Sequence, residues 1–94
     1  MRTNINVRWE TLKSQGRGAV SDLSASGCFV LTGGEVVPHE LARLDIMLSG
    51  EVMTLWGSVV YAISEMGFAV RFVVDSEADR QTIERIITKA RSIV

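Results

Sequence analysis

The spacing of apolar residues changes once along this chain, and that change limits the possible folds more than any other feature. Over most of the first seventy residues apolar and polar side chains alternate, as in the segment around Ile5, Val7 and Trp9. Alternation with a period of two is typical of a half-buried strand. After Asp75 the apolar residues recur at intervals of three and four, which indicates a helix. These are Ile83, Ile86, Ile87, Ala90 and Ile93 or Val94.

Short turn sequences divide the alternating region into six expected strands. They cover residues 5–10, 18–23, 28–31, 41–48, 52–63 and 68–72, with turns at 14–18, 49–50 and 64–67. Gly57 in the middle of the fifth strand predicts a bulge or a sharp coil there. Asp75 or Ser76 is expected to cap the helix. Several short strands with close turns favour an antiparallel barrel or sandwich, with the helix over an open end or an edge.

Length and composition indicate one folded domain over residues 1–94, with strands within about 4–73 and a helix over about 76–93. The chain has 94 residues, of which 47% are apolar. No stretch is apolar enough to serve as a secretory signal or a membrane span. We therefore expect a cytoplasmic protein without membrane insertion. The formal charge of −1 argues against binding to a nucleic-acid polymer, which usually requires a basic excess.

The sequence offers little for catalysis. It contains no phosphate-binding loop, dinucleotide fingerprint, zinc-protease motif or nucleophile elbow. His39 is the one histidine, expected on a loop after Pro38, and Cys28 is the one cysteine, expected as a buried structural thiol. No ligand spacing for a metal is recognisable. The prediction is a protein that is not an enzyme and holds no metal or cofactor.

The segment Asp22-Leu-Ser-Ala-Ser-Gly27 has two interpretations. As a turn, Asp22 and the serines would bond nearby backbone, and Gly27 would adopt a positive φ. As a binding loop, the Asp22 carboxylate would accept hydrogen bonds from the N1–H and exocyclic amine of a guanine. The Ser24 hydroxyl would bond a phosphate or a base, and Gly27 would let the ligand approach the backbone.

Three motifs in order resemble the PilZ domain family over roughly residues 4–94. They are the DxSxxG string of Asp22, Ser24 and Gly27, then Gly57-Ser-Val-Val-Tyr61, then Gly67-Phe-Ala-Val-Arg-Phe72, followed by the amphipathic helix. The resemblance implies a mainly β fold, a six-stranded antiparallel barrel closed by the C-terminal helix. It also implies a bacterial receptor for cyclic di-GMP, in which Asp22, Ser24 and Gly27 contact the nucleotide.

The second motif of the family, RxxxR ahead of the first strand, is incomplete. Arg2 falls near the place of its second arginine, and the first would lie upstream of Met1. Either the chain lacks half of the site, or it is a piece of a longer protein. Arg8 has the wrong spacing and lies within the first strand, but Arg8, Arg17 in a turn, or Arg71 on the polar side of the last strand would be able to compensate.

The sequence therefore supports two functional hypotheses. In the first, the domain binds cyclic di-GMP, its N-terminal arm with Arg2 becomes ordered, and the changed surface is offered to an unidentified protein effector. In the second, it is a nucleotide-blind interaction module that shares the PilZ fold alone. In both it is expected to be a monomer or a weak dimer. Trp9 is expected in the core, because it is in phase with Ile5 and Val7, while the place of Trp56 is open.

Overall fold

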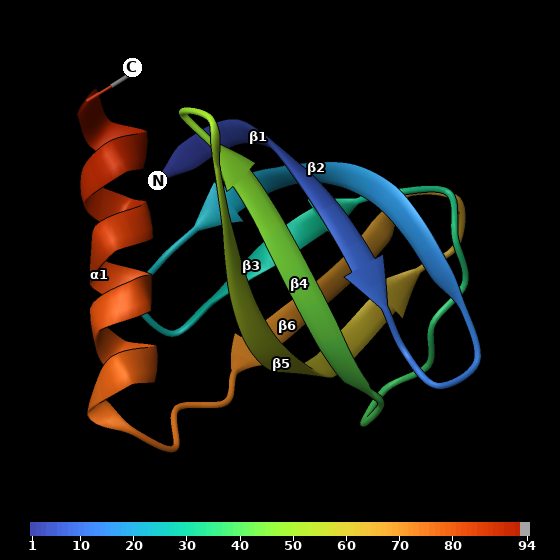
Figure 1. Cartoon of the computed structure of the whole chain (residues 1–94). Helices are drawn as coiled ribbons and strands as arrows, with labels where there is room; N and C mark the ends of the chain where they lie inside the picture. The colour runs from blue at the N-terminus through green and yellow to red at the C-terminus, as the bar shows by residue number, and fades with distance from the viewer. Residues whose placement is uncertain (93–94) are drawn as a thin grey trace.

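The computed structural model describes residues 1–92, which form six strands followed by one helix (Figure 1). The elements are β1 (Arg2–Glu10), β2 (Gln15–Leu23), β3 (Gly27–Leu31), β4 (Leu41–Leu48), β5 (Glu51–Ile63), β6 (Gly67–Phe72) and α1 (Glu77–Ser92). Each strand pairs antiparallel with its neighbours in the order β1-β2-β3-β6-β5-β4, and β4 returns to β1 to close the barrel. The predicted fold class is confirmed. Ile93 and Val94, which the predicted apolar stripe included, lie outside the described residues.

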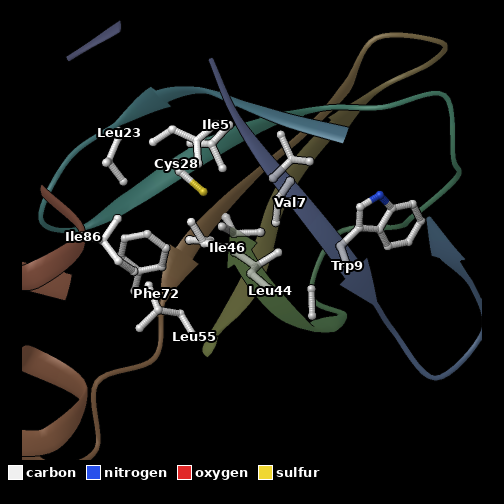
Figure 2. Packing of buried hydrophobic residues seen from close by; sticks show 14 of the residues in the cluster. Ile5, Val7, Trp9, Leu23, Cys28, Leu44, Ile46, Leu55, Phe72 and Ile86 are labelled. Carbon is white, nitrogen blue, oxygen red and sulfur yellow. The ribbon is translucent and has the colours of Figure 1, made fainter. Parts of the chain in front are cut away.

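The inward-facing side chains of the strands fill the barrel (Figure 2). Trp9 is completely buried, which confirms its predicted place in the core. Its ring meets the ring of Phe68 edge to face, with 5.3 Å between centroids, and its Nε1 donates a hydrogen bond to Thr32 Oγ1 at 3.1 Å. Figure 2 shows Trp9 at one end of the core and Leu23, Cys28 and Phe72 gathered near Ile86 of the helix at the other.

Helix α1 stands against one end of the barrel (Figure 1) and buries Ile83, Ile86 and Ala90 there. Ile87 is partly buried beside them. The Ser76 hydroxyl accepts a hydrogen bond from the Asp79 amide at 3.2 Å, so Ser76 caps the helix as one of the two predicted candidates. Within residues 1–92, no helix combines the length and the apolar character needed to cross a bilayer.

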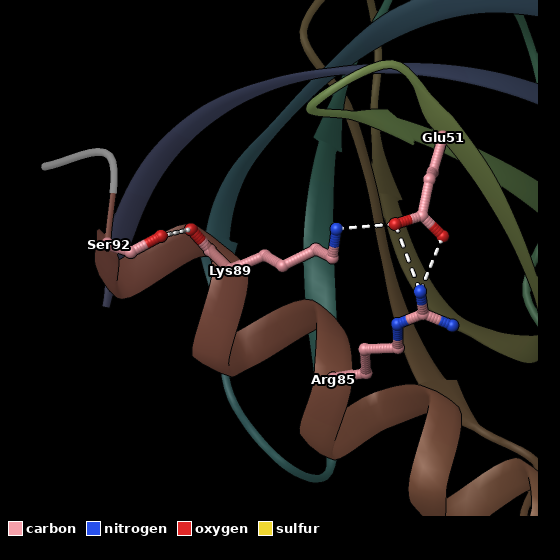
Figure 3. Close-up of polar contacts among 4 residues, drawn as sticks. All are labelled: Glu51, Arg85, Lys89 and Ser92. Atoms are coloured by element: carbon pink, nitrogen blue, oxygen red, sulfur yellow. Dashed lines mark hydrogen bonds and ion pairs between the residues drawn. The ribbon is translucent and has the colours of Figure 1, made fainter.

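A cluster of charges attaches the helix to the β4–β5 hairpin (Figure 3). Arg85 Nη2 donates to the two carboxylate oxygens of Glu51 at 3.0 and 2.8 Å, and Lys89 Nζ donates to Glu51 Oε1. The hydrogen bond from Lys89, together with the charge of Arg85, holds the pKa of the Glu51 carboxyl below its ordinary value of 4.5. The pairs are exposed or half-buried, so their contribution to stability is small.

Two expected boundaries, the starts of β1 and β2, differ from the structure by three residues each. Strand β2 begins at Gln15, so Arg17 lies in a strand opposite Arg8 and not in a turn. Hydrogen bonds between Thr11 and Ser14 close the preceding turn and leave the two glycines after it free to join the strand. Strand β1 begins at Arg2, so this residue is not on a free arm.

Gly57 does not carry the expected bulge. It pairs regularly with Ala42 of β4 on one side and with Phe72 of β6 on the other. Strand β5 is long enough to pair first with β4 and then with β6, and Gly57 lies where the two pairings overlap. The register shift occurs after Val59, and Val60 is the extra residue. The bulge was therefore predicted in the correct strand but three residues too early.

Candidate functional site

The position of Asp22 depends on an irregularity in β2. Val20 is buried, and strict alternation would direct Asp22 to the same inner side of the barrel. The register between β2 and β3 shifts between Val20 and Asp22, so that Ser21 is an extra residue. The shift reverses the alternation, and Asp22 is therefore exposed while Leu23 is buried. Bulges often redirect a side chain in this way beside a functional site.

A second irregularity has the same effect in β5. Leu55 and Val59 are buried, and alternation would direct Tyr61 into the core with them. The extra residue Val60 reverses the phase, and Tyr61 is 49% exposed.

The two shifts bring one row of residues to the outer surface across five strands. In register, Arg2 pairs with Asp22, Asp22 with Phe29, Phe29 with Ala69, and Ala69 with Tyr61. All five are exposed or half-buried. Residues on the same face in neighbouring strands lie within reach of one another, so this row joins a carboxylate to an aromatic segment. The linear sequence does not show the complete row, because the row depends on the register between strands.

The loop between β2 and β3 is closed by its own serines. Ser24 N–H donates to Gly27 O at 2.9 Å, and Ser24 Oγ donates to the same oxygen at 3.3 Å. Ser26 O accepts a hydrogen bond from Phe72 N–H at 2.9 Å, which fixes the loop to β6. Ser24 therefore stabilises the turn, as the turn interpretation predicts. Its hydroxyl remains at the exposed surface, where a ligand could also reach it.

Gly27 is required for a reason that neither interpretation anticipated. Its φ is not in the positive range, so the prediction of a positive φ is wrong. A Cβ at this position would lie 2.1 Å from the carbonyl oxygen of Val70 in β6. A glycine is needed at this position because the backbones of β3 and β6 approach closely here.

These residues line one open groove over β2, β3, β6 and β5, with a volume of about 520 Å³. We call it the Asp22 groove. It brings together Asp22, Ser24, Gly27 and Arg71, four of the predicted site residues. Its aromatic and apolar walls include Phe29, Val60, Tyr61 and Met66. Within residues 1–92, neither Asp22 nor Arg71 takes part in an ion pair. The groove thus presents an unpaired carboxylate and an unpaired guanidinium beside aromatic rings.

The remaining predicted arginines lie outside the lining of this groove. Arg2 is at its border, opposite Asp22 in register. Arg8 and Arg17 face each other on β1 and β2, where both are exposed, and Arg8 also pairs with Asp45 of β4. The structure therefore brings Arg71 to the candidate site and leaves Arg8 and Arg17 on another part of the barrel.

Comparison with known proteins agrees with the fold and the motifs. The profile of the PilZ domain matches residues 1–89. The chain belongs to the PilZ domain family. Its fold is similar to the PilZ domain of CeSA from a cellulose-synthesizing bacterium, with a TM-score of 0.79 and 17% sequence identity over 94% of this chain and 93% of that one. No curated protein is similar enough in sequence to count as a relative.

The fold is also similar to the Bacillus subtilis inhibitor of motility, MotI/DgrA. The TM-score is 0.68, with 19% identity over 95% of this chain. The PilZ domain described here spans about half of that protein, which is covered to 49%. At these identities the two similarities concern the fold.

A second hollow of the PilZ domain, with a volume of about 530 Å³, lies between the β1–β2 turn, the start of β4, and β5. We call it the Trp56 hollow. Leu12, Leu41 and Trp56 line it and are all exposed, which answers the open question about Trp56. Its charged residues include Glu10 and Arg43, which form an ion pair at 2.8 Å. The hollow is thus an apolar surface bordered by charges that partly neutralise one another.

The other chemically versatile side chains are in positions that offer no reaction site. Cys28 is buried, and burial raises the pKa of its thiol to about 12, so it stays a thiol at neutral pH. His39 lies in a turn with φ of 75°, in the expected loop. Among residues 1–92, no three His, Cys, Asp or Glu side chains gather as a metal site would require.

Proposed function

We propose that this PilZ domain is a receptor that binds cyclic di-GMP in the Asp22 groove. PilZ domains are regulatory binding domains rather than enzymes, and the proposal assigns this chain the same kind of role. The observation that carries it is the meeting of Asp22, Ser24, Gly27 and Arg71 in a single groove. Three of these residues form the DxSxxG motif, and the fourth comes from a strand far along the sequence.

The chemistry of the groove suits a guanine nucleotide. The Asp22 carboxylate is exposed and outside any ion pair of the described residues, so it can accept hydrogen bonds from the N1–H and amine of a guanine. Arg71 lies in β6, opposite Gly27 in register, and its side chain is exposed. A guanidinium binds a phosphate through two parallel hydrogen bonds. Arg2, at the border, would add a second cation to the same nucleotide.

The proposed output is a changed surface offered to a protein effector in the cytoplasm. Because Arg2 already lies in β1 and pairs with β2, ordering of an N-terminal arm around this residue is not part of the proposal. The nucleotide itself would alter the shape and the charge of the outer face of β2, β3 and β6, since it would add phosphates beside Arg71. An effector would recognise that combined surface.

A nucleotide-blind interaction module is the second candidate function. The Trp56 hollow favours it, because three large apolar side chains are exposed together there. In that case the residues of the Asp22 groove would serve the turn and the strand pairing alone, as the hydrogen bonds of Ser24 and the packing of Gly27 do.

Isothermal titration calorimetry with cyclic di-GMP separates the two functions. The wild-type chain should give saturable heat at micromolar ligand, in low and in moderate salt. Asp22→Ala removes a charged partner of about two hydrogen bonds, so affinity should fall by roughly 100-fold or more while the circular dichroism spectrum stays unchanged. Glu35→Ala, an exposed loop carboxylate away from the groove, is the matched control and should bind like the wild type.

Absence of heat from the wild-type chain at millimolar ligand would overturn the receptor proposal and leave the interaction module. Unchanged binding by Asp22→Ala would show that the nucleotide does not use the proposed carboxylate.

A further inference from the structure

The turn between β1 and β2 presents a leucine to solvent. The fractional exposure of Leu12 is 104%, so its own fold does not bury its side chain. Turn positions usually carry Gly, Pro, Asn, Asp or Ser, whose side chains expose little apolar surface. A leucine at this place leaves apolar surface in water, and burial against a second surface would be favourable.

Hydrogen bonds hold this turn in one shape. Thr11 is buried, and its Oγ1 accepts hydrogen bonds from the amides of Ser14 at 3.1 Å and Lys13 at 3.3 Å. The Thr11 amide donates to Ser14 O at 2.8 Å, and Ser14 Oγ donates to Glu35 O at 2.9 Å. Leu12 is therefore presented on an ordered support, and little conformational entropy remains to be lost when the turn binds another surface.

The Trp56 hollow lies directly beside the turn. Leu41 and Trp56 line it and are 52% and 46% exposed. Trp56 pairs in register with Arg43, two residues from Leu41 on the same face of β4, so the two apolar side chains are diagonal neighbours. Leu12 lines the hollow from its edge but stays fully exposed, so it does not fill the hollow of its own chain.

The charges around the hollow balance, but two of them have no partner. Glu10 and Arg43 form an ion pair, whereas Lys13 and Glu40 take part in none within residues 1–92. Glu40 Oε1 accepts a hydrogen bond from the Val37 amide at 3.3 Å, while its Oε2 is buried without a hydrogen-bond partner. A carboxylate in this condition is stabilised by a cation that comes close to it.

We propose that the Trp56 hollow is a contact between two copies of this chain, in which Leu12 of each copy enters the hollow of the other between Leu41 and Trp56. Lys13 follows Leu12 and Glu40 precedes Leu41, so the unpaired ammonium of one copy would lie beside the unpaired carboxylate of the other. A two-fold axis requires a surface that carries both halves of the contact, and this face carries both.

The inference concerns a surface outside the Asp22 groove and goes beyond the receptor function. One turn and one hollow from each copy bury little surface, so the dimer is expected to be weak. With His39 neutral, the charges that line the hollow, those of Glu10, Lys13, Glu40 and Arg43, sum to zero. Two such faces therefore approach each other without net repulsion.

Sedimentation equilibrium of the chain without nucleotide tests the proposal. The wild type should form dimers reversibly between about 10 μM and about 1 mM, the range of a weak interface. Leu12→Ala should raise the dissociation constant by roughly 100-fold, because each dimer loses two buried leucine side chains. Leu31→Ala, which removes an exposed leucine outside the hollow, is the matched control and should leave the dissociation constant unchanged.

Charge reversal shows whether the contact runs between chains. Lys13→Glu would place two carboxylates together across the axis, and Glu40→Lys would place two ammonium groups together. Each variant should therefore be monomeric alone, with the circular dichroism spectrum of the wild type. An equal mixture of the two should form dimers, because both contacts between the unlike variants join opposite charges. A role within one chain would not be restored by mixing.

The outcomes that overturn the proposal are distinct from failure of the receptor function, because no step uses cyclic di-GMP. A wild-type chain that stays monomeric at about 1 mM would overturn it. An unchanged dissociation constant in Leu12→Ala would do the same. Charge variants that stay monomeric in the mixture would contradict the two-fold arrangement of Lys13 and Glu40.

Discussion

Two hollows of the PilZ domain have nearly equal volumes, about 520 and 530 Å³, but their arginines differ in whether they already have partners. In the Trp56 hollow, Glu10 and Arg43 already pair with each other at 2.8 Å. In the Asp22 groove, Asp22 and Arg71 take part in no ion pair within residues 1–92. The volume of a hollow therefore says little about its ligand. An unpaired carboxylate and an unpaired guanidinium in one groove indicate a ligand that carries both hydrogen-bond donors and a negative charge.

The two hollows also differ in how the sheet forms them. The β4–β5 pairing beside the Trp56 hollow is regular along its whole length. The Asp22 groove lies between two register shifts, at Ser21 in β2 and at Val60 in β5. Each shift exposes a side chain, Asp22 or Tyr61, that regular alternation would bury. The irregular part of the barrel is thus the part equipped for recognition.

Gly27→Ala should give the largest effect, because it disturbs the barrel where the Asp22 groove is formed. The new Cβ would lie 2.1 Å from the Val70 carbonyl oxygen, and separating β3 from β6 should cost about 3 kcal/mol of unfolding free energy. Urea unfolding measures this cost. Gly33→Ala is the control, because a Cβ there meets no heavy atom within 4 Å, and it should change stability by less than about 0.5 kcal/mol. Equal stability of both variants would refute the steric role of Gly27.

Arg71→Ala compares the groove with the basic residues outside it. Loss of one charge-assisted contact to a phosphate should weaken cyclic di-GMP binding by about 10- to 100-fold. Arg8→Ala removes an exposed arginine of β1 that does not line the groove, and it should bind like the wild type. Calorimetry on the two variants decides between these arginines, and a larger loss in Arg8→Ala would reverse the assignment.

Glu51→Gln should give the smallest effect, because Glu51 belongs to neither hollow. The lowered pKa of Glu51 means that its contribution to stability is present above pH 4.5 and disappears as the pH falls through the lowered value. The variant should therefore be slightly less stable than the wild type at pH 7, by a difference that shrinks as the pH falls below 4.5, with nucleotide binding unaffected. Glu84→Gln, on the same helix and outside any described ion pair, should show no such pH-dependent difference. A stability difference that does not shrink at any acidic pH at which the domain stays folded would contradict the charge-based explanation.

Much of the fold could be predicted from the sequence because hydrophobic periodicity directly reports which side of an element is buried. The six strands, the burial of Trp9 and the apolar stripe of the helix from Ile83 to Ala90 were confirmed. The starts of β1 at Arg2 and of β2 at Gln15 were not predicted. These strand ends are polar or rich in glycine, and they belong to strands because β1 and β2 pair with each other, which the local sequence does not show.

The candidate site was predictable only in part. Asp22, Ser24 and Gly27 are adjacent in the sequence and form a motif, but Tyr61 and Phe29 join them through register. The residues next to Tyr61 in the sequence are all apolar, so no alternation shows which of them face the core. The bulge at Val60 therefore could not be predicted from the sequence. In β2 a signal did exist. Val20 and Leu23 are both apolar at an odd separation with Asp22 between them, which is the pattern that a bulge produces.

The most direct test of the central claim is an amide nuclear magnetic resonance titration of the wild-type chain with cyclic di-GMP, because one experiment observes both hollows. The account predicts saturable shift changes at Asp22, Gly27, Phe29, Tyr61 and Arg71, with Leu12 and Trp56 unchanged. Shift changes confined to the Trp56 hollow, or none at millimolar nucleotide, would contradict the claim that the Asp22 groove is the nucleotide site of this PilZ domain.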